Sequence, residues 1–74
     1  MDRQKIAKNL IILRGKRTQS EVAKAINVSQ SSYAMYETGK RVPSDEVKIA
    51  IANYFNRTVQ EIFFEQILTN SDIA

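Results

Sequence analysis

The stretch that decides the fold is Thr18–Glu37, with the sequence TQSEVAKAINVSQSSYAMYE. Thr18 and Glu21 have the spacing of a capping box, in which the threonine oxygen accepts a backbone N–H and the glutamate reaches back to the cap. A helix is therefore expected to begin at Gln19. Its apolar residues have the spacing of one helix face; they are Val22, Ala23 and Ile26.

A second helix is expected to begin at Gln30. Ser29 is a favourable N-cap residue, and Asn27 suits the left-handed conformation that often ends a helix. Only three or four residues then connect the two helices. So short a connection is unsuited to an antiparallel pair and typical of a helix-turn-helix, whose helices cross at a steep angle.

This second helix is expected to expose an uncharged face. Tyr33 and Tyr36 stand three residues apart and form its inner edge, which leaves an outer edge of Gln30, Ser31, Ala34 and Met35. A solvated helix face normally carries Lys and Glu. Small and uncharged side chains, with an amide in the first turn, suit instead the base edges in the major groove of DNA.

The remaining helices are expected on similar grounds. Asp2 is suited to cap a helix running to about Arg14, where Gly15 ends it. Ser44 caps a fourth helix, and a second capping box at residues 58–61 opens a fifth. The apolar stripes of these three helices are Ile6, Leu10 and Leu13, then Val47, Ile51 and Phe55, then Val59, Ile62, Phe63 and Ile67.

Some apolar residues lie outside these core-facing stripes. Ile11 and Ile12 either widen the buried face of the first helix or place one residue in a subunit contact. Phe64 and Leu68 fall to one side of the final stripe. In so small a chain an apolar surplus on the last helix indicates a partner surface, and a second copy of the chain is the simplest partner.

Composition narrows the function further. The 74 residues form one domain and include no cysteine and no histidine, so the usual ligands and catalytic groups of metal and hydrolytic sites are missing. No signal peptide or membrane-spanning run is evident, and a cytoplasmic location is expected. Residues 1–41 carry nine Lys and Arg against three acidic residues, whereas residues 42–74 carry two against five. The basic half suits a polyanion such as DNA.

Several short motifs follow one another along the chain in a characteristic order. The motifs are Ile6, Leu10, Leu13 and Arg14, then Thr18-Gln19, Ala23 and Val28-Ser29, then Tyr36-Glu37, Gly39-Lys40-Arg41 and Pro43-Ser44, and finally Ala52, Phe55-Asn56 and Glu61-Ile62-Phe63. In this order they resemble the Cro and phage-repressor family of helix-turn-helix regulators, the xenobiotic-response-element type. The resemblance implies an all-α, compact five-helix domain similar to that of the lambda repressor. We expect it to span residues 1–68, with the helix-turn-helix at 19–37 and a flexible tail at 69–74.

The resemblance also implies an ion pair between the arginine that ends the first helix and the glutamate that ends the recognition helix, here Arg14 and Glu37. The connection between the first two helices is about two residues shorter than is usual in the family. Arg17 is therefore an alternative partner for Glu37. If buried, such a pair fixes orientation more than it adds stability.

The resulting hypothesis is a sequence-specific, duplex-DNA-binding transcriptional regulator. Gln30 is the best candidate for reading a base, because its amide can bond the N6 and N7 atoms of adenine, with Ser31, Ala34 and Met35 beside it. Gln19 is expected to hold a phosphate and to brace Gln30. The full set of expected phosphate contacts is Thr18, Gln19, Ser32, Lys40, Arg41, Arg17 and Lys24.

We expect the regulator to be a repressor that acts as a homodimer on a palindromic operator, with Phe64, Ile67 and Leu68 in the dimer interface. The alternative is an antitoxin-like or anti-repressor module that keeps the fold but binds protein. An enzyme is not expected, since clustered carboxylates away from helix N-termini are absent as well. No cofactor, metal or small-molecule ligand is expected either.

Overall fold

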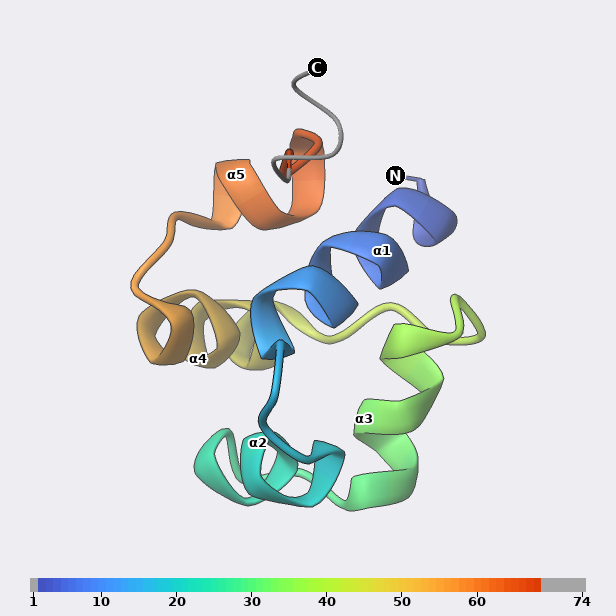
Figure 1. The fold of residues 1–74 in the computed structure, drawn as a ribbon, viewed down its shortest axis with the longest axis vertical. Helices are drawn as coiled ribbons and strands as arrows, with labels where there is room; N and C mark the ends of the chain where they lie inside the picture. Colours follow the sequence, from blue (N-terminus) through green and yellow to red (C-terminus); the bar gives the residue numbers. More distant parts are fainter. Residues whose placement is uncertain (1, 69–74) are drawn as a thin grey trace.

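The computed structural model describes residues 2–68, which form five helices (Figure 1). The helices are α1 (Arg3–Arg14), α2 (Gln19–Ala25), α3 (Gln30–Glu37), α4 (Asp45–Phe55) and α5 (Val59–Phe64). The described part of the chain contains no strand, so the all-α five-helix fold is confirmed. The tail expected at residues 69–74 lies outside the described residues. In the span from 2 to 68, no helix combines the length and apolarity needed to cross a membrane.

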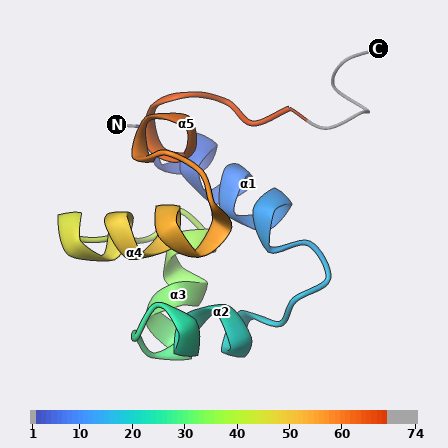
Figure 2. The same ribbon diagram turned by 90° about the vertical axis from the view of Figure 1, so that its left-hand side faces the viewer.

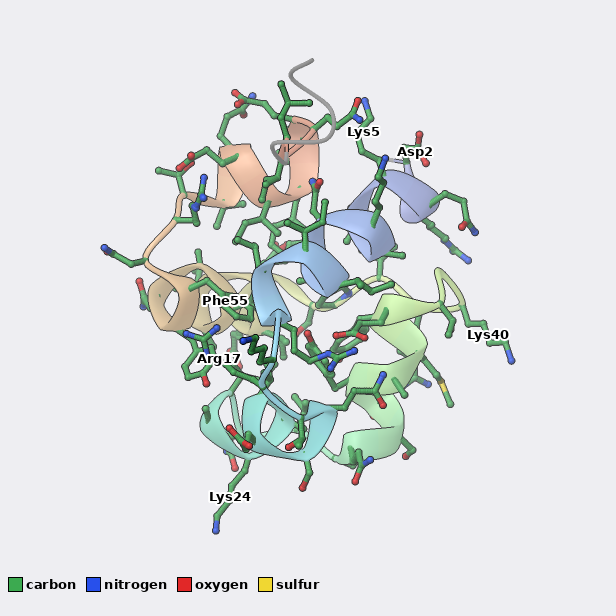
Figure 3. All side chains as sticks on the ribbon, in the orientation of Figure 1. Asp2, Lys5, Arg17, Lys24, Lys40 and Phe55 are labelled. Atoms are coloured by element: carbon green, nitrogen blue, oxygen red, sulfur yellow. The ribbon has the colours of Figure 1, made fainter. Side chains whose placement is uncertain are left out.

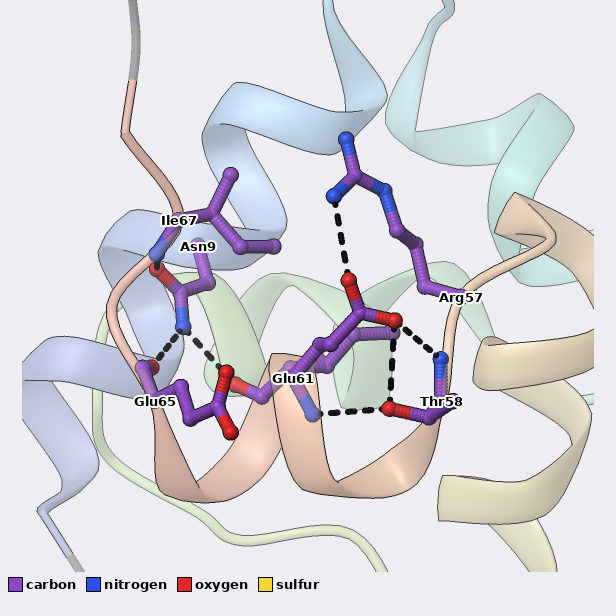
Figure 4. A network of polar contacts seen from close by, with 7 residues as sticks. Asn9, Arg57, Thr58, Glu61, Glu65 and Ile67 are labelled. Carbon is purple, nitrogen blue, oxygen red and sulfur yellow. Dashed lines mark hydrogen bonds and ion pairs between the residues drawn. The ribbon is translucent and has the colours of Figure 1, made fainter.

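All five helices begin at the N-cap that the sequence indicates. The cap side chains, which accept backbone N–H groups of the first turn, belong to Asp2, Thr18, Ser29, Ser44 and Thr58. At Thr58 both hydrogen bonds of the capping box form, as Figure 4 shows. At Thr18 only the bond from the Glu21 N–H to the threonine oxygen forms, at 3.0 Å. The helix starts are therefore set by local chemistry.

Residues with positive φ follow four of the helices, among them the expected Asn27. Asn27, just after α2, has φ 62°, and Asn56, just after α4, has φ 55°. Gly15 and Gly39 follow α1 and α3 with φ 55° and 77°. Glycine and asparagine tolerate such values better than other residues do. The chain can therefore reverse direction within a few residues at each of these points.

The core forms where α1 lies between α3 and α5 (Figures 1 and 2). α2 packs against α3, and α4 packs against α5, which closes the two remaining sides. The buried apolar side chains come from all five helices and from the segment after α5: Ile6, Leu10, Val22, Ala23, Ile26, Tyr33, Tyr36, Ile51, Ala52, Ile62, Phe63 and Ile67. Of the surplus residues on α1, Ile12 packs partly against this core and Ile11 is 48% exposed.

A buried asparagine on α1 holds the chain that follows α5. The Asn9 amide nitrogen donates to the carbonyl oxygens of Ile62 and Glu65, both at 2.8 Å, and its oxygen accepts the N–H of Ile67 at 2.9 Å (Figure 4). Asn9 is fully buried. A single side chain thus satisfies three backbone groups at the end of α5, where helical bonds stop.

The structure corrects the expectation that the last helix continues to Ile67. α5 ends at Phe64, and Glu65 is extended with ψ 174°, so Ile67 and Leu68 lie beyond the helix and not on its face. Ile67 turns inward and is only 7% exposed in the isolated protomer. Ile67 thus lies in the core, as its place in the final apolar stripe predicts. Phe64 and Leu68 remain 54% and 56% exposed.

We predict that Asn9→Ala lowers the free energy of unfolding by about 3 kcal/mol, because it leaves two carbonyls and one N–H without their partner. Urea unfolding followed by circular dichroism measures this change. Asn53→Ala is the matched control, since Asn53 is exposed on α4. Equal and small effects of the two substitutions would contradict a structural role for Asn9.

Candidate nucleic-acid interface

α2 and α3 form the two helices of a helix-turn-helix, and α3 runs across the end of α2 (Figure 1). Between them the Val28 N–H donates to the Ala23 carbonyl at 3.0 Å, and the Val28 side chain packs against the core. Ser29 then caps α3. The turn between Ile26 and Gln30 is therefore held from both ends, which fixes the angle of α3 relative to α2.

The outer face of α3 is open to solvent and carries no charge. Gln30, Ser31 and Met35 are exposed and Ala34 is partly exposed, whereas Tyr33 and Tyr36 are buried. The two tyrosine rings pack edge to face, with their centroids 6.3 Å apart. The division of α3 into a tyrosine edge and an uncharged edge, expected from the sequence, is thus confirmed.

Three serine hydroxyls gather at the start of α3. The Ser29 oxygen accepts the N–H of Ser32, and its own O–H donates to the Ser32 oxygen at 3.0 Å. The Ser31 oxygen lies 3.3 Å from that of Ser29. The Ser32 hydroxyl therefore keeps its hydrogen available for an outside acceptor, such as a phosphate oxygen.

An ion pair joins the end of α1 to the end of α3. The Arg14 Nε atom lies 2.7 Å from Glu37 Oε2, and Arg14 donates through a second nitrogen to Glu37 Oε1 at 3.1 Å. The Glu37 side chain is only 3% exposed and the Arg14 side chain 23%. The expected pair is confirmed, with Arg14 and not Arg17 as the partner. Such a two-point contact restricts orientation strongly.

Gln19 joins this ion pair from the start of α2. Its amide nitrogen donates to Glu37 Oε1 at 3.0 Å, so the brace that we expected between Gln19 and Gln30 is instead made to Glu37. Burial would by itself raise the pKa of Glu37. The hydrogen bonds and the charge of its partners outweigh burial, so this pKa lies below the ordinary glutamate value. The three side chains therefore tie α1, α2 and α3 together around a carboxylate that stays ionised.

The hydroxyl of Tyr33 is buried and has no hydrogen-bond partner among the described residues. Burial raises the pKa of this hydroxyl far above its ordinary value, so the group stays neutral. Tyr33 therefore serves as a large packing side chain on the inner edge of α3.

The loop after α3 is tied back to that helix. The N–H groups of Lys40 and Arg41 both donate to the Met35 carbonyl, at 3.0 and 3.3 Å, and the Thr38 hydroxyl donates to the same oxygen. The Lys40 and Arg41 side chains are exposed. The bonds to Met35 thus hold the backbone of Lys40 and Arg41 against the last turn of α3, so two exposed positive charges follow the end of its uncharged face.

Two of the expected phosphate-binding side chains lie elsewhere. The Arg17 guanidinium lies 5.6 Å from the ring centroids of both Tyr54 and Phe55 on α4, and it donates to the Leu13 carbonyl (Figure 3). Lys24 extends from the far part of α2, well away from Lys40 (Figure 3). Gln19, Ser32, Lys40 and Arg41 thus lie on α3 or contact it, and Thr18 caps α2, whereas Arg17 lies against α4 and Lys24 projects elsewhere.

Comparison with known families decides the classification. A family model described as helix-turn-helix matches residues 5–62, which include α2, α3 and most of the core. The chain belongs to the helix-turn-helix family. The matched span agrees with the resemblance seen in the sequence, and it includes the ion pair, the turn and the loop after α3.

A solved structure supports this assignment. The solution structure of an SOS-response transcriptional repressor, LexA from Eubacterium rectale, superposes on this helix-turn-helix protein with a TM-score of 0.82. The two sequences are 26% identical, and the alignment covers 92% of this chain and 74% of the other. A search of curated proteins gave no significant match.

Two contacts that position the helices were not predicted from the sequence. Asn9 lies on the core face of α1, three residues after Ile6, and an amide at this place in the apolar repeat is the signal from which a buried hydrogen-bonding role could have been predicted. The contact of Arg17 with two rings of α4 had no comparable signal in the sequence. It depends on where the short α1–α2 connection carries the chain in three dimensions.

The lowered pKa of Glu37 predicts how stability depends on pH. A carboxyl whose pKa is lower in the folded chain adds stability above its unfolded pKa, about 4.3, and that stability is lost as the pH falls through the folded pKa. We expect the free energy of unfolding of the wild type to fall below about pH 4.3, and that of Glu37→Gln to fall less. At neutral pH the substitution should cost about 2–4 kcal/mol, because Arg14 loses its counter-charge.

Urea unfolding at a series of pH values measures both effects. Glu46→Gln is the control, since Glu46 is exposed in the first turn of α4. If Glu37→Gln and the wild type lose the same stability in acid, Glu37 does not carry the acid sensitivity.

Proposed function

We propose that this helix-turn-helix protein is a sequence-specific repressor that acts as a homodimer on a palindromic operator. Its family membership makes it a DNA-binding transcriptional regulator in the broader sense. The printed description of the LexA relative, an SOS-response transcriptional repressor, supports repression as the more specific role. The proposal assigns the recognition surface to α3 and the dimer contact to the region around the end of α5.

The observation that carries the DNA-reading role is the uncharged, exposed face of α3, which has a free hydroxyl hydrogen at its start and exposed cations after its end. The Ser32 hydroxyl lies at the start of α3, and Gln19 at the start of α2 bonds Glu37 at its end. Lys40 and Arg41 follow that end and are held in place through the Met35 carbonyl. A recognition helix in a major groove needs this division, because phosphate contacts orient the protein and uncharged side chains read base edges.

Within this face Gln30 is the residue that we propose reads a base. It is the first residue of α3, it is exposed, and no side-chain hydrogen bond within residues 2–68 occupies its amide. A glutamine can bond both N6 and N7 of adenine, which discriminates against a wrong base by roughly 1–3 kcal/mol. Ser31, Ala34 and Met35 lie on the same face and would meet neighbouring bases or thymine methyl groups.

The homodimer is proposed from apolar exposure near the C-terminal end of the described chain. Phe64 and Leu68 flank the buried Ile67, and each is more than half exposed. An exposed pair of large apolar side chains in a small domain favours a partner surface. A twofold dimer would place two α3 helices about 34 Å apart, one turn of DNA, and so would require a palindromic site.

Fluorescence anisotropy tests the DNA-reading proposal. The labelled duplexes are the region upstream of the protein's own gene and a scrambled duplex of equal length. We expect the wild type to prefer the upstream duplex and its affinity to fall steeply as salt rises. Gln30→Ala should lower the preference by roughly 5- to 150-fold at one base pair, with nonspecific affinity nearly unchanged.

Two outcomes would contradict this part of the proposal. An equal loss for Gln30→Ala on all duplexes would remove its base-reading role. Absent binding to either duplex, together with capture of a protein partner that depends on Phe64, would instead favour the antitoxin-like or anti-repressor module.

The dimer proposal predicts that Phe64→Glu yields a monomer in sedimentation velocity, because a charge would have to be buried in the interface. Ile49→Glu is the matched control, since Ile49 on α4 is equally exposed, at 55% against 54% for Phe64. It should leave the dimer intact. A dimer that survives Phe64→Glu and dissociates on Ile49→Glu would place the interface on α4.

A further inference from the structure

The start of α1 lies against the loop that follows α3. Gly39 in this loop has φ 77°, and a Cβ atom placed on it would stand 2.7 Å from the Gln4 side-chain nitrogen and 3.5 Å from the Arg3 carbonyl oxygen. Only a glycine allows an approach this close at this backbone conformation without moving the glutamine. The backbone of Arg3 and the loop that carries Lys40 are therefore neighbours, although 37 positions separate them in sequence.

The helical repeat places the Arg3 side chain on the face of α1 that turns toward α3. Arg3, Ala7, Leu10 and Arg14 follow one another at spacings of four, three and four residues, so they form one stripe. Ala7 and Leu10 are buried, and Arg14 reaches Glu37 at the end of α3. Arg3 stands at the exposed end of this stripe, next to the loop of Gly39.

The other cations of the first turns lie on different faces. Lys5 is two positions from Arg3, about 200° around the helix, and Figure 3 shows it directed toward the α5 end of the molecule, away from Lys40. The carboxylate of Asp2 lies near Arg3 in sequence, but it accepts the N–H groups of Gln4 and Lys5 as the N-cap. Arg3 thus shares an edge with Lys40 and Arg41, and Lys5 does not.

We propose that Arg3 is a further phosphate-binding residue, which extends the Lys40–Arg41 side of the interface onto α1. The inference rests on the proposed DNA-binding surface and names an additional contact of that surface. The ligand is the sugar-phosphate backbone of duplex DNA, bound by charge without regard to sequence. Gly39 has a positioning role, because it lets the loop approach α1 closely enough for Arg3 and Lys40 to meet the same strand.

The salt dependence of binding tests this proposal. Each phosphate contact contributes about 0.9 to the slope of log affinity against log salt concentration. Anisotropy on a scrambled duplex, between about 50 and 200 mM salt, should give a slope smaller by about 0.9 for Arg3→Gln than for the wild type. The affinity near 50 mM salt should fall roughly tenfold. Arg3→Lys should keep the wild-type slope.

The matched control is Lys5→Gln, which removes the same charge from the same helix on another face. It should leave the slope unchanged, and Arg3→Gln combined with Lys40→Gln should reduce the slope by about twice 0.9. Circular dichroism should show that all variants remain folded. An unchanged slope in Arg3→Gln, or an equal reduction in Lys5→Gln, would overturn the assignment of Arg3. A wild type without measurable duplex binding would overturn the proposed function and this inference together.

Discussion

The two-point contact between Arg14 of α1 and Glu37 of α3 is the constraint on which the rest of this structure depends. It fixes α1 against α3, and Gln19 extends it to the start of α2. It also explains how α3 can expose an uncharged face. Glu37, the only ionised side chain of α3, is turned inward, and the positive charge of Arg14 compensates its negative charge. A buried pair of this kind contributes more to orientation than to net stability.

The same helix, α1, links the two proposed surfaces. One face carries Arg14 toward α3 and Arg3 toward the loop after it, where DNA phosphates are proposed to bind. Another face carries Asn9, which holds the chain beyond α5, where Phe64 and Leu68 are exposed. Packing of α1 therefore sets the position of the proposed dimer contact relative to the recognition helix, and hence the spacing of the two halves of an operator.

Much of the fold could be predicted from the sequence, because local chemistry determines it. Caps such as Ser29 and Thr58, and the left-handed Asn27 and Asn56, act within a few residues of themselves. Longer-range contacts were harder to predict. The end of α5 depends on Asn9, more than fifty residues away, and Arg17 meets α4 only after the short connection has directed the chain. The exposed face of α3 could be predicted from helical periodicity. The hydrogen bond from Gln19 to Glu37 could not, because it depends on tertiary packing.

Binding of DNA by α3 can be tested directly by titrating the ¹⁵N-labelled protein with duplex DNA at low salt and following the chemical shifts of its backbone amides. We expect shifts at the start of α2, along α3, at residues 39–41 and at Arg3, with little change at residues 64–68. Shifts confined to residues 64–68 and α5, or no shifts at all, would contradict this expectation. In that case the protein would not use its helix-turn-helix to bind DNA.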